Sequence, residues 1–239
     1  MTKVALVTGS AVRIGREMAS YLAGNGWNLA LHYSSSNNEI SELEHELKLR
    51  YPTQNFCVFQ ADLGDTFQTE KLILRVIEQF GSLDLLINNA SVFEPSSLKT
   101  TTKDLLVRHS MINFMAPFIL MRDFANLSGN GQIINVLDTR ITENKSDYIA
   151  YSLSKKTLFE LTKMAALELA PYFRVNAIAP GAVLPPPGKD QSYLEKIAGN
   201  TPMKIPSGLT SILKTLDYII ENQDLTGQVI FCDGGSHLL

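Results

Sequence analysis

Short apolar runs alternate with segments of helical period along the whole chain, and this alternation constrains the fold more than any other feature. Such runs are typical of parallel strands buried on both faces, and the helical segments between them indicate repeated strand–helix–strand units. The predicted strands are Lys3–Val7, Asn28–His32, Asn55–Gln60, Leu83–Asn88, Gly131–Val136, Arg174–Ala179 and Gln228–Cys232. The predicted helices are Gly15–Asn25, Glu39–Arg50, Phe67–Phe80, Thr102–Leu127, Ala150–Ala170 and Ser207–Glu221. The sequence therefore predicts an α/β fold with one doubly wound, seven-stranded parallel sheet.

The length of 239 residues allows one large α/β domain or two small ones. Because no composition shift, linker or internal repeat marks a second domain, we expect a single domain over residues 1–239. The one irregular stretch, residues 180–206, is rich in Pro and Gly and holds a short helical piece near residues 193–198. It follows the carboxyl end of a predicted strand, where ligands bind in doubly wound sheets, so we predict a loop over the substrate. An ordinary surface loop is the alternative.

Charge and cysteine content exclude several classes of function. The net charge is -3, with basic and acidic residues interspersed, so we expect neither a nucleic acid nor an anionic membrane as partner. Cys57 and Cys232 lie in apolar runs without the paired spacing of a zinc or redox site, which favours reduced thiols and no metal. The chain shows neither a charged leader nor an apolar run of about 18 residues. We therefore expect a soluble cytoplasmic protein.

A glycine turn joins the first predicted strand to the first predicted helix. Gly9 permits a tight turn after Thr8, and Gly15 permits the helix to pack closely on the strand. The backbone N–H groups of this turn, and the positive end of the helix that opens near Ile14, suit a pyrophosphate. Arg13 stands between the glycines, and its side chain can reach back over the phosphates. The turn indicates a dinucleotide site, with an ordinary strand–turn–helix and a surface arginine as the alternative.

The end of the second predicted strand indicates which dinucleotide binds. A carboxylate there would accept hydrogen bonds from a ribose 2′-hydroxyl and repel a 2′-phosphate. No acid occurs before Glu39, and the residues that stand there instead are His32, Tyr33, Ser34, Ser35 and Ser36. Hydroxyls and a histidine can donate to a phosphate, so we predict NADPH as the cofactor. Serines that merely fill a loop are the alternative.

Tyr151 and Lys155 form the candidate proton-transfer pair. They are four residues apart in a predicted helix, so their side chains lie on one face, one turn apart. An ammonium beside a phenol favours the phenolate, so we expect the pKa of Tyr151 to lie below its usual value of about 10. Tyr151 would then exchange a proton with the reacting atom while Lys155 holds the nicotinamide ribose. Tyr148 is the nearest rival, but no lysine stands one turn further on.

In this order the motifs resemble those of the short-chain dehydrogenase/reductase family from end to end. The chain is most similar to the pteridine reductases of that family at Arg13, Leu31–Tyr33, Asn88–Phe93 and Asp138. The resemblance implies a single Rossmann-type domain, hydride transfer from NADPH and a homotetramer. It also implies that the substrate is a pterin or a dihydrofolate-like ring.

The resemblance assigns roles to further residues. The implied cofactor contacts beyond the glycine turn are Asp62, Leu63, Asn89, Ala90, Ser91, Tyr151, Lys155, Pro180 and Gly181. Asn113 is implied to bind a water that links Lys155 to solvent. Phe93 is implied to stack on the pterin, and Ser91 to bond its amino edge. A helix cap at Asp62, a packing hydrogen bond at Asn113 and a core side chain at Phe93 are the alternatives.

Asp138 stands thirteen residues before Tyr151, where most of the family has a serine. An ionised carboxylate would oppose the negative charge that develops on a ketone oxygen, whereas it suits a ring nitrogen that must gain a proton. The resemblance therefore implies that Asp138 assists Tyr151 in protonating a pterin. An inert site, or Thr139 as the substitute hydroxyl, is the alternative. For the whole chain, the alternatives are a general NADP(H)-dependent carbonyl reductase of the same family and a non-catalytic cofactor-binding regulator.

Overall fold

The structure is a computed structural model that describes residues 2–185 and 188–239. Within these residues seven strands form one parallel sheet in the order β3-β2-β1-β4-β5-β6-β7. The strands are β1 (Val4–Val7), β2 (Asn28–Tyr33), β3 (Phe56–Gln60), β4 (Leu85–Asn88), β5 (Gly131–Val136), β6 (Phe173–Pro180) and β7 (Val229–Cys232). The predicted fold class is confirmed: one α/β domain with a seven-stranded parallel sheet.

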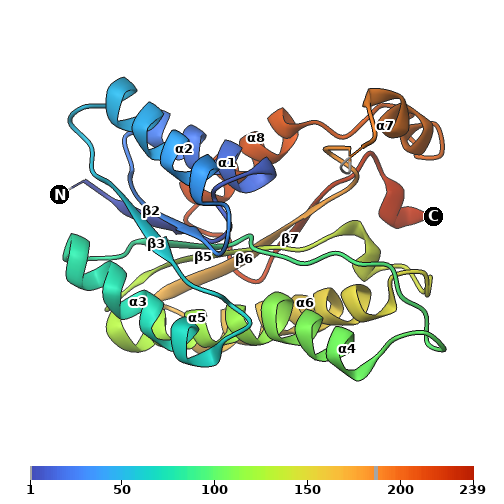
Figure 1. The fold of residues 1–239 in the computed structure, drawn as a ribbon, viewed down its shortest axis with the longest axis horizontal. Helices are drawn as coiled ribbons and strands as arrows, with labels where there is room; N and C mark the ends of the chain where they lie inside the picture. Colours follow the sequence, from blue (N-terminus) through green and yellow to red (C-terminus); the bar gives the residue numbers. More distant parts are fainter. Residues whose placement is uncertain (1, 186–187) are drawn as a thin grey trace.

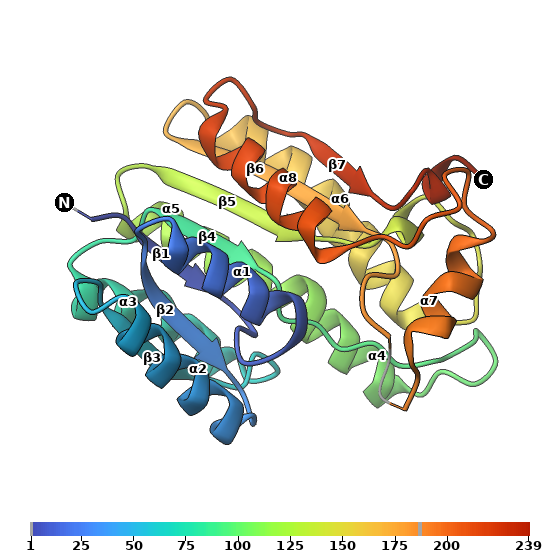
Figure 2. The ribbon, with the colours of Figure 1, turned by 90° about the horizontal axis from the view of Figure 1, so that it is seen from above.

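Helices cover both faces of this sheet (Figures 1 and 2). One face carries α1 (Arg13–Gly24), α2 (Asn37–Arg50) and α8 (Leu209–Glu221). The other carries α3 (Thr66–Phe80), α5 (Ala116–Leu127) and α6 (Ile149–Leu169). Successive residues of a strand point to opposite faces, so Val7 packs with Met18 in the first layer and Leu6 with Leu72 in the second. The sheet is therefore apolar on both sides, which explains the near-continuous apolar strand sequences.

The predicted helix over residues 102–127 is wrong in one respect, because a π-helical turn interrupts it. The segment folds as α4 (Lys103–Ser110), the π turn η1 (Met111–Met115) and α5. A π turn widens the backbone locally, and such turns are common at functional sites. The other predicted long helices begin and end within two residues of α1, α2, α3, α6 and α8.

The irregular stretch after β6 contains α7 (Gln191–Ala198), which includes the short helical piece expected there. Residues 186 and 187 of the predicted substrate loop lie outside the described residues. Among the helices that the structure describes, none is long and apolar enough to cross a membrane.

The strand order fixes where a ligand can bind. From β1 the chain winds outward to β2 and β3, and from β4 it winds the other way through β5, β6 and β7. The connections after β1 and β4 therefore diverge, and a crevice opens at the carboxyl ends of these two strands.

Candidate active site

A cavity of about 1230 Å³ lies at the carboxyl ends of the strands. This volume exceeds that of ordinary small-molecule sites, about 300–1,000 Å³, so it can hold a dinucleotide together with a second ring. The predicted site residues that line the cavity are Gly9, Arg13, Ile14, Gly15, His32, Ser34, Ser35, Asp62, Leu63, Asn89, Ala90, Ser91, Phe93, Asp138, Tyr151, Lys155, Pro180 and Gly181.

The turn after β1 lets the backbone approach a ligand closely. Gly9 has φ +64°, a conformation that favours glycine, and a Cβ on Gly15 would lie 2.2 Å from the carbonyl oxygen of Gly9. The Asn89 amide donates to the carbonyl oxygens of Thr8 and Gly9, at 2.8 and 3.2 Å, and so holds the turn. Val12, at the start of α1, offers the first helical turn no side-chain acceptor. The N–H groups of that turn therefore suit the pyrophosphate of a dinucleotide.

His32 contributes to this turn differently from the sequence-based prediction. Its ring is buried, Nδ1 accepts the N–H of Gly9 at 3.0 Å, and Nε2 lies 3.1 Å from the carbonyl oxygen of Ala61, to which it can donate. Burial lowers the pKa of His32 to about 4, so the ring is neutral at pH 7. Both ring nitrogens therefore already have partners within the protein. The prediction that His32 donates a hydrogen bond to a phosphate is wrong. The side chain instead braces the glycine turn against the ends of β2 and β3.

His32 should make the protein sensitive to acid. Its pKa is about 4 in the folded state against 6.5 in the unfolded chain, so the unfolded state binds more protons between these values. The free energy of unfolding should then fall as the pH drops from 6.5 to 4, by about 3 kcal/mol over the whole window. Urea unfolding of His32→Asn at about pH 7 and about pH 4.5 should show a smaller pH dependence than the wild type. The exposed His45→Asn is the matched control, and an unchanged pH dependence in His32→Asn would contradict the assignment.

The serines after β2 are divided between the cavity and the fold. Ser34 and Ser35 line the cavity. Among the described residues, no Asp or Glu at the end of β2 lines it with them. Tyr33 packs against the hydrophobic core, and Ser36 precedes the first turn of α2. Asp62 lines the cavity and accepts the N–H of Gly64 at 2.8 Å, while Asp65 caps α3. The alternative in which Asp62 is the cap of this helix is therefore wrong, and its contact with adenine stays a prediction.

Arg13 reaches across the mouth of the cofactor crevice. It has φ +56°, and its guanidinium donates to the carbonyl oxygens of Leu184 at 3.3 Å and Pro185 at 3.1 Å. The side chain thus joins the turn after β1 to the segment after β6, on the two sides of the crevice. A contact from Arg13 to phosphate stays a prediction.

Asp138, Tyr151 and Lys155 meet at the wall of the same cavity. The Tyr151 hydroxyl donates to Oδ2 of Asp138 at 2.7 Å, and the backbone N–H of Arg140 donates to Oδ1 of Asp138 at 2.9 Å. Lys155 Nζ donates to the carbonyl oxygen of Val136 at 2.7 Å and lies 5.9 Å from the centre of the Tyr151 ring. The spacing of four residues in α6 therefore brings Tyr151 and Lys155 to one face, as predicted.

The expected decrease in the pKa of Tyr151 is wrong. Burial and the neighbouring carboxyl of Asp138 raise the pKa of Tyr151 well above its usual value, so the phenol keeps its proton at pH 7. Burial also raises the pKa of Asp138, although the hydrogen bonds that its carboxyl accepts partly oppose this by lowering the pKa. Burial lowers the pKa of Lys155 to about 8, with the charge of Asp138 opposing, so Lys155 stays mostly protonated at pH 7. Tyr151 is thus suited to donate a proton rather than to remove one.

Asn113 holds the segment after β4. Its carbonyl oxygen accepts the N–H of Val92 at 2.9 Å and the Ser91 hydroxyl at 3.1 Å. Its amide nitrogen donates to the carbonyl oxygen of Val92 and to the Ser154 hydroxyl, both at 3.0 Å. The side chain of Asn113 in η1 therefore fixes the backbone just before Phe93, and its role in a water chain stays a prediction.

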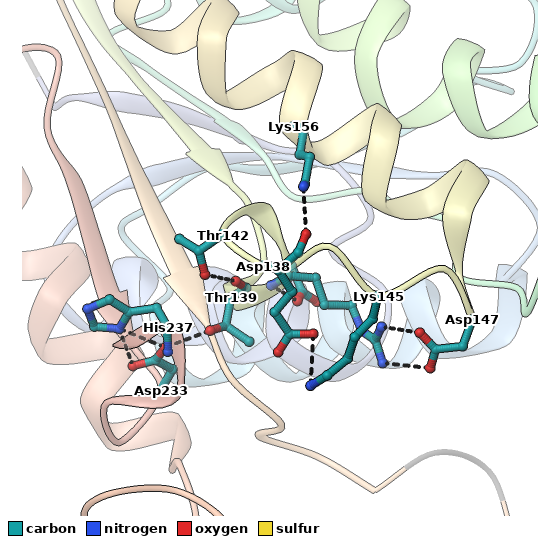
Figure 3. Close-up of polar contacts among 10 residues, drawn as sticks. Asp138, Thr139, Thr142, Lys145, Asp147, Lys156, Asp233 and His237 are labelled. Atoms are coloured by element: carbon teal, nitrogen blue, oxygen red, sulfur yellow. Dashed lines mark hydrogen bonds and ion pairs between the residues drawn. The ribbon is translucent and has the colours of Figure 1, made fainter. Parts of the chain in front are cut away.

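A cluster of Thr139, Asp233 and His237 holds the residue next to Asp138. This cluster was not predicted from the sequence. The Thr139 hydroxyl donates to Asp233 Oδ2 at 2.6 Å, and Nδ1 of His237 lies 2.9 Å from the same oxygen (Figure 3). The Thr139 hydroxyl thus uses its one hydrogen-bond donor on Asp233. The alternative in which Thr139 donates to a ketone oxygen in place of a serine is therefore not supported. The only sequence signal was the acid directly after the last strand.

Comparisons with solved structures agree with this geometry. FolM alternative dihydrofolate reductase 1 from Brucella canis, complexed with NADP, matches with a TM-score of 0.91 and 33% identity, over 99% of this chain and 95% of that chain. The corresponding protein from Brucella suis, in complex with NADP, matches with a TM-score of 0.90 and 32% identity, over 99% and 96%.

Sequence comparisons point to the same family, and the relatives that they find are named for a different reaction. The 3-oxoacyl-[acyl-carrier-protein] reductase FabG of Staphylococcus aureus is 29% identical over 252 residues, with 100% of this chain and 99% of that protein covered. FabG of Staphylococcus epidermidis is 30% identical over 257 residues, with both proteins fully covered. Residues 3–193 match the family described as short chain dehydrogenase. This chain therefore belongs to the short-chain dehydrogenase family and is an NAD(P)-dependent oxidoreductase.

Proposed function

We propose that this protein transfers a hydride from NADPH to a pterin or a dihydrofolate-like ring, with Tyr151 as the proton donor. The observation that carries the proposal is the 2.7 Å hydrogen bond from the Tyr151 hydroxyl to Asp138. A carboxyl group stands where a ketone reductase needs a donor to the developing oxyanion. The FolM proteins, which are named as dihydrofolate reductases, support the same substrate class.

The cofactor end of the cavity would hold NADPH through its backbone and three side chains. The glycine turn and the first turn of α1 would bind the pyrophosphate, and Ser34 and Ser35 the 2′-phosphate. One of the three ammonium N–H groups of Lys155 is used by Val136, and the others can bind ribose hydroxyls. When bound, NADPH supplies the hydride.

Reduction of a carbon–nitrogen double bond requires a hydride on carbon and a proton on nitrogen. Tyr151 supplies the proton, because its raised pKa keeps the phenol protonated at neutral pH. Asp138 orients the phenol. With its raised pKa it can take up a proton from solvent after the transfer and pass that proton to the Tyr151 phenolate. A charged ammonium at Lys155 stabilises the phenolate formed during transfer.

The acceptor ring would lie between Phe93 and the nicotinamide. Phe93 lines the cavity, and 51% of its surface is exposed. Ser91 also lines the cavity, so its hydroxyl can bond a polar ring edge. Residues 181–184 and α7 contribute the remaining wall, which supports the predicted substrate loop.

A general carbonyl reductase is the second candidate, because the FabG proteins act on 3-oxoacyl groups by name. Against it, both oxygens of Asp138 accept hydrogen bonds, from Tyr151 and from the Arg140 N–H. In this arrangement the ionised Asp138 has no proton with which to donate a hydrogen bond to a substrate oxygen. The homotetramer and the cytoplasmic location stay predictions.

An assay of NADPH oxidation separates the two candidates. We expect turnover with dihydrobiopterin or dihydrofolate, and weak or no turnover with a panel of ketones that includes an acetoacetyl thioester. Turnover of the thioester without turnover of either dihydropterin would refute the proposal and leave the carbonyl reductase.

A further inference from the structure

Three side chains form a continuous stack beside the acceptor end of the cavity. The rings of Phe93 and Tyr148 are nearly parallel, with an interplanar angle of 8° and centroids 4.2 Å apart. The guanidinium carbon of Arg140 lies 4.7 Å from the centre of the Tyr148 ring. Because Phe93 covers one face of Tyr148 at contact distance, the guanidinium must lie over the other face. The order of the stack is therefore Arg140, Tyr148, Phe93.

The outer end of this stack is anchored by an ion pair. Both terminal nitrogens of Arg140 donate to Asp147, at 2.9 and 3.3 Å, and two dashed lines end on the Asp147 carboxylate in Figure 3. A two-point contact of this kind fixes the plane of the guanidinium as well as its position. Because Asp147 directly precedes Tyr148, the pair also closes the short loop between η2 (Thr139–Ile141) and α6.

The inner end of the stack is anchored through the backbone. The N–H of Ser96 donates to the carbonyl oxygen of Asp147 at 3.0 Å, and the N–H of Ile149 donates to that of Ser96 at 3.1 Å. Asn113 holds Val92, the residue before Phe93, at both its N–H and its carbonyl oxygen. The backbone on both sides of Tyr148 is thus joined to Ser96, after Phe93, and Asn113 holds the residue before Phe93.

Phe93 is therefore a fixed wall of the acceptor site. It lines the same cavity as Asp138 and Tyr151, and its ring meets that of Tyr151 edge-on, at 4.6 Å and 85°. Although Tyr148 covers one face, 51% of Phe93 stays exposed. A ring held in one plane before binding loses little rotational freedom when a flat ligand stacks on it.

We propose that Tyr148, held by Arg140, is a positioning residue that sets the plane of Phe93 and thereby selects flat conjugated acceptors over flexible chains. The inference rests on the proposed acceptor site at Asp138 and Tyr151. It adds that ring selection depends on a residue one layer behind Phe93, which is not among the described residues that line the cavity. A merely structural Tyr148 would affect flat and flexible substrates alike.

The test compares Tyr148→Leu with Tyr148→Phe on three probes. Dihydrobiopterin is the flat pterin, isatin a flat conjugated ketone and ethyl acetoacetate a flexible ketone. Loss of the aromatic support in Tyr148→Leu should raise KM for both flat probes about three- to tenfold, with little change in kcat. For a probe that the wild type does not reduce, Ki against dihydrobiopterin replaces KM. KM or Ki for ethyl acetoacetate should not rise. Tyr148→Phe retains the stacked ring and should restore KM for the flat probes.

A second pair of variants tests the Arg140 end of the stack, where Arg140 itself also lines the cavity, and applies even where Tyr148→Leu fails to fold. Arg140→Gln removes the cation from the Tyr148 ring, whereas Asp147→Asn removes the ion pair but leaves the cation. Arg140→Gln should raise KM for the flat probes more than Asp147→Asn does. Equal changes in KM for flat and flexible probes, in either pair of variants, would overturn the inference.

Failure of the inference is distinguishable from failure of the proposed function. If the wild type reduces isatin but no dihydropterin, the proposed function fails, and the effect of Tyr148→Leu on KM for isatin still decides the role of Tyr148. If the wild type reduces dihydropterin and KM is unchanged in both Tyr148→Leu and Arg140→Gln, the inference alone fails. If the wild type reduces ethyl acetoacetate and neither flat probe, both fail.

Discussion

Replacing Tyr151 by phenylalanine should lower kcat for the preferred substrate by about 10²–10⁴-fold, the usual contribution of general acid catalysis. The change removes only the hydroxyl, which is the group that donates to Asp138 at 2.7 Å. The aromatic ring remains, so its edge-on contact with Phe93 should persist. Single-turnover oxidation of NADPH measures the loss, and fluorescence titration should show nearly unchanged binding of NADPH.

The matched control for this variant is Tyr218→Phe. Tyr218 lies in α8, where its side chain is exposed, and it is not among the described residues that line the cavity. It should keep the wild-type kcat. Most of the wild-type activity remaining in Tyr151→Phe would mean that another group, with Asp138 the first candidate, is the acid. Loss of NADPH binding in the same variant would mean that Tyr151 acts on the cofactor instead.

The framework of the fold was predictable because it depends on local patterns. Each strand is a short apolar run, and its residues point alternately into two apolar layers, as Leu6 and Val7 do. Helix periodicity gave the long helices to within two residues. The π turn over Met111–Met115 was missed, because one widened turn hardly changes the order of apolar residues along a helix.

The candidate proton-transfer pair was predictable in position but not in its titration. Four-residue spacing in a helix places Tyr151 and Lys155 on one face, and this needs no tertiary information. The pKa of Tyr151 depends instead on burial and on Asp138, which tertiary packing brings to 2.7 Å. Proximity to Lys155 was the only effect visible in the sequence, so the direction of the shift was wrong.

Long-range hydrogen bonds account for the remaining differences. His32 is the last residue but one of β2, yet its two ring nitrogens face the turn after β1 and the end of β3. Thr139 follows β5, yet its hydroxyl donates to Asp233 after β7. Such partners are set by strand order, which only the assembled sheet determines. A polar residue at a strand end could therefore be placed at the cavity rim, but its partner could not be named.

Asp138→Ser should distinguish the two substrate classes by the direction of the change in activity. Serine can still accept the N–H of Arg140 and so preserve the backbone turn that Asp138 now caps. It cannot supply a carboxyl that orients and reprotonates Tyr151. If the substrate is a pterin, kcat should fall about 10–100-fold, the range expected for loss of a hydrogen bond to a charged group.

For a ketone the same change should raise activity. A serine hydroxyl can donate to the oxyanion that develops as the hydride arrives, whereas an ionised carboxylate repels it. Asp138→Asn is the matched variant, because it removes the charge at constant size and cannot reprotonate the phenol. We expect both variants to lose dihydrobiopterin turnover and Asp138→Ser to gain ketone turnover, measured as kcat/KM on each probe. A gain in dihydrobiopterin turnover in Asp138→Ser would refute the assigned role of Asp138, because the carboxyl would then be hindering the transfer it is proposed to assist.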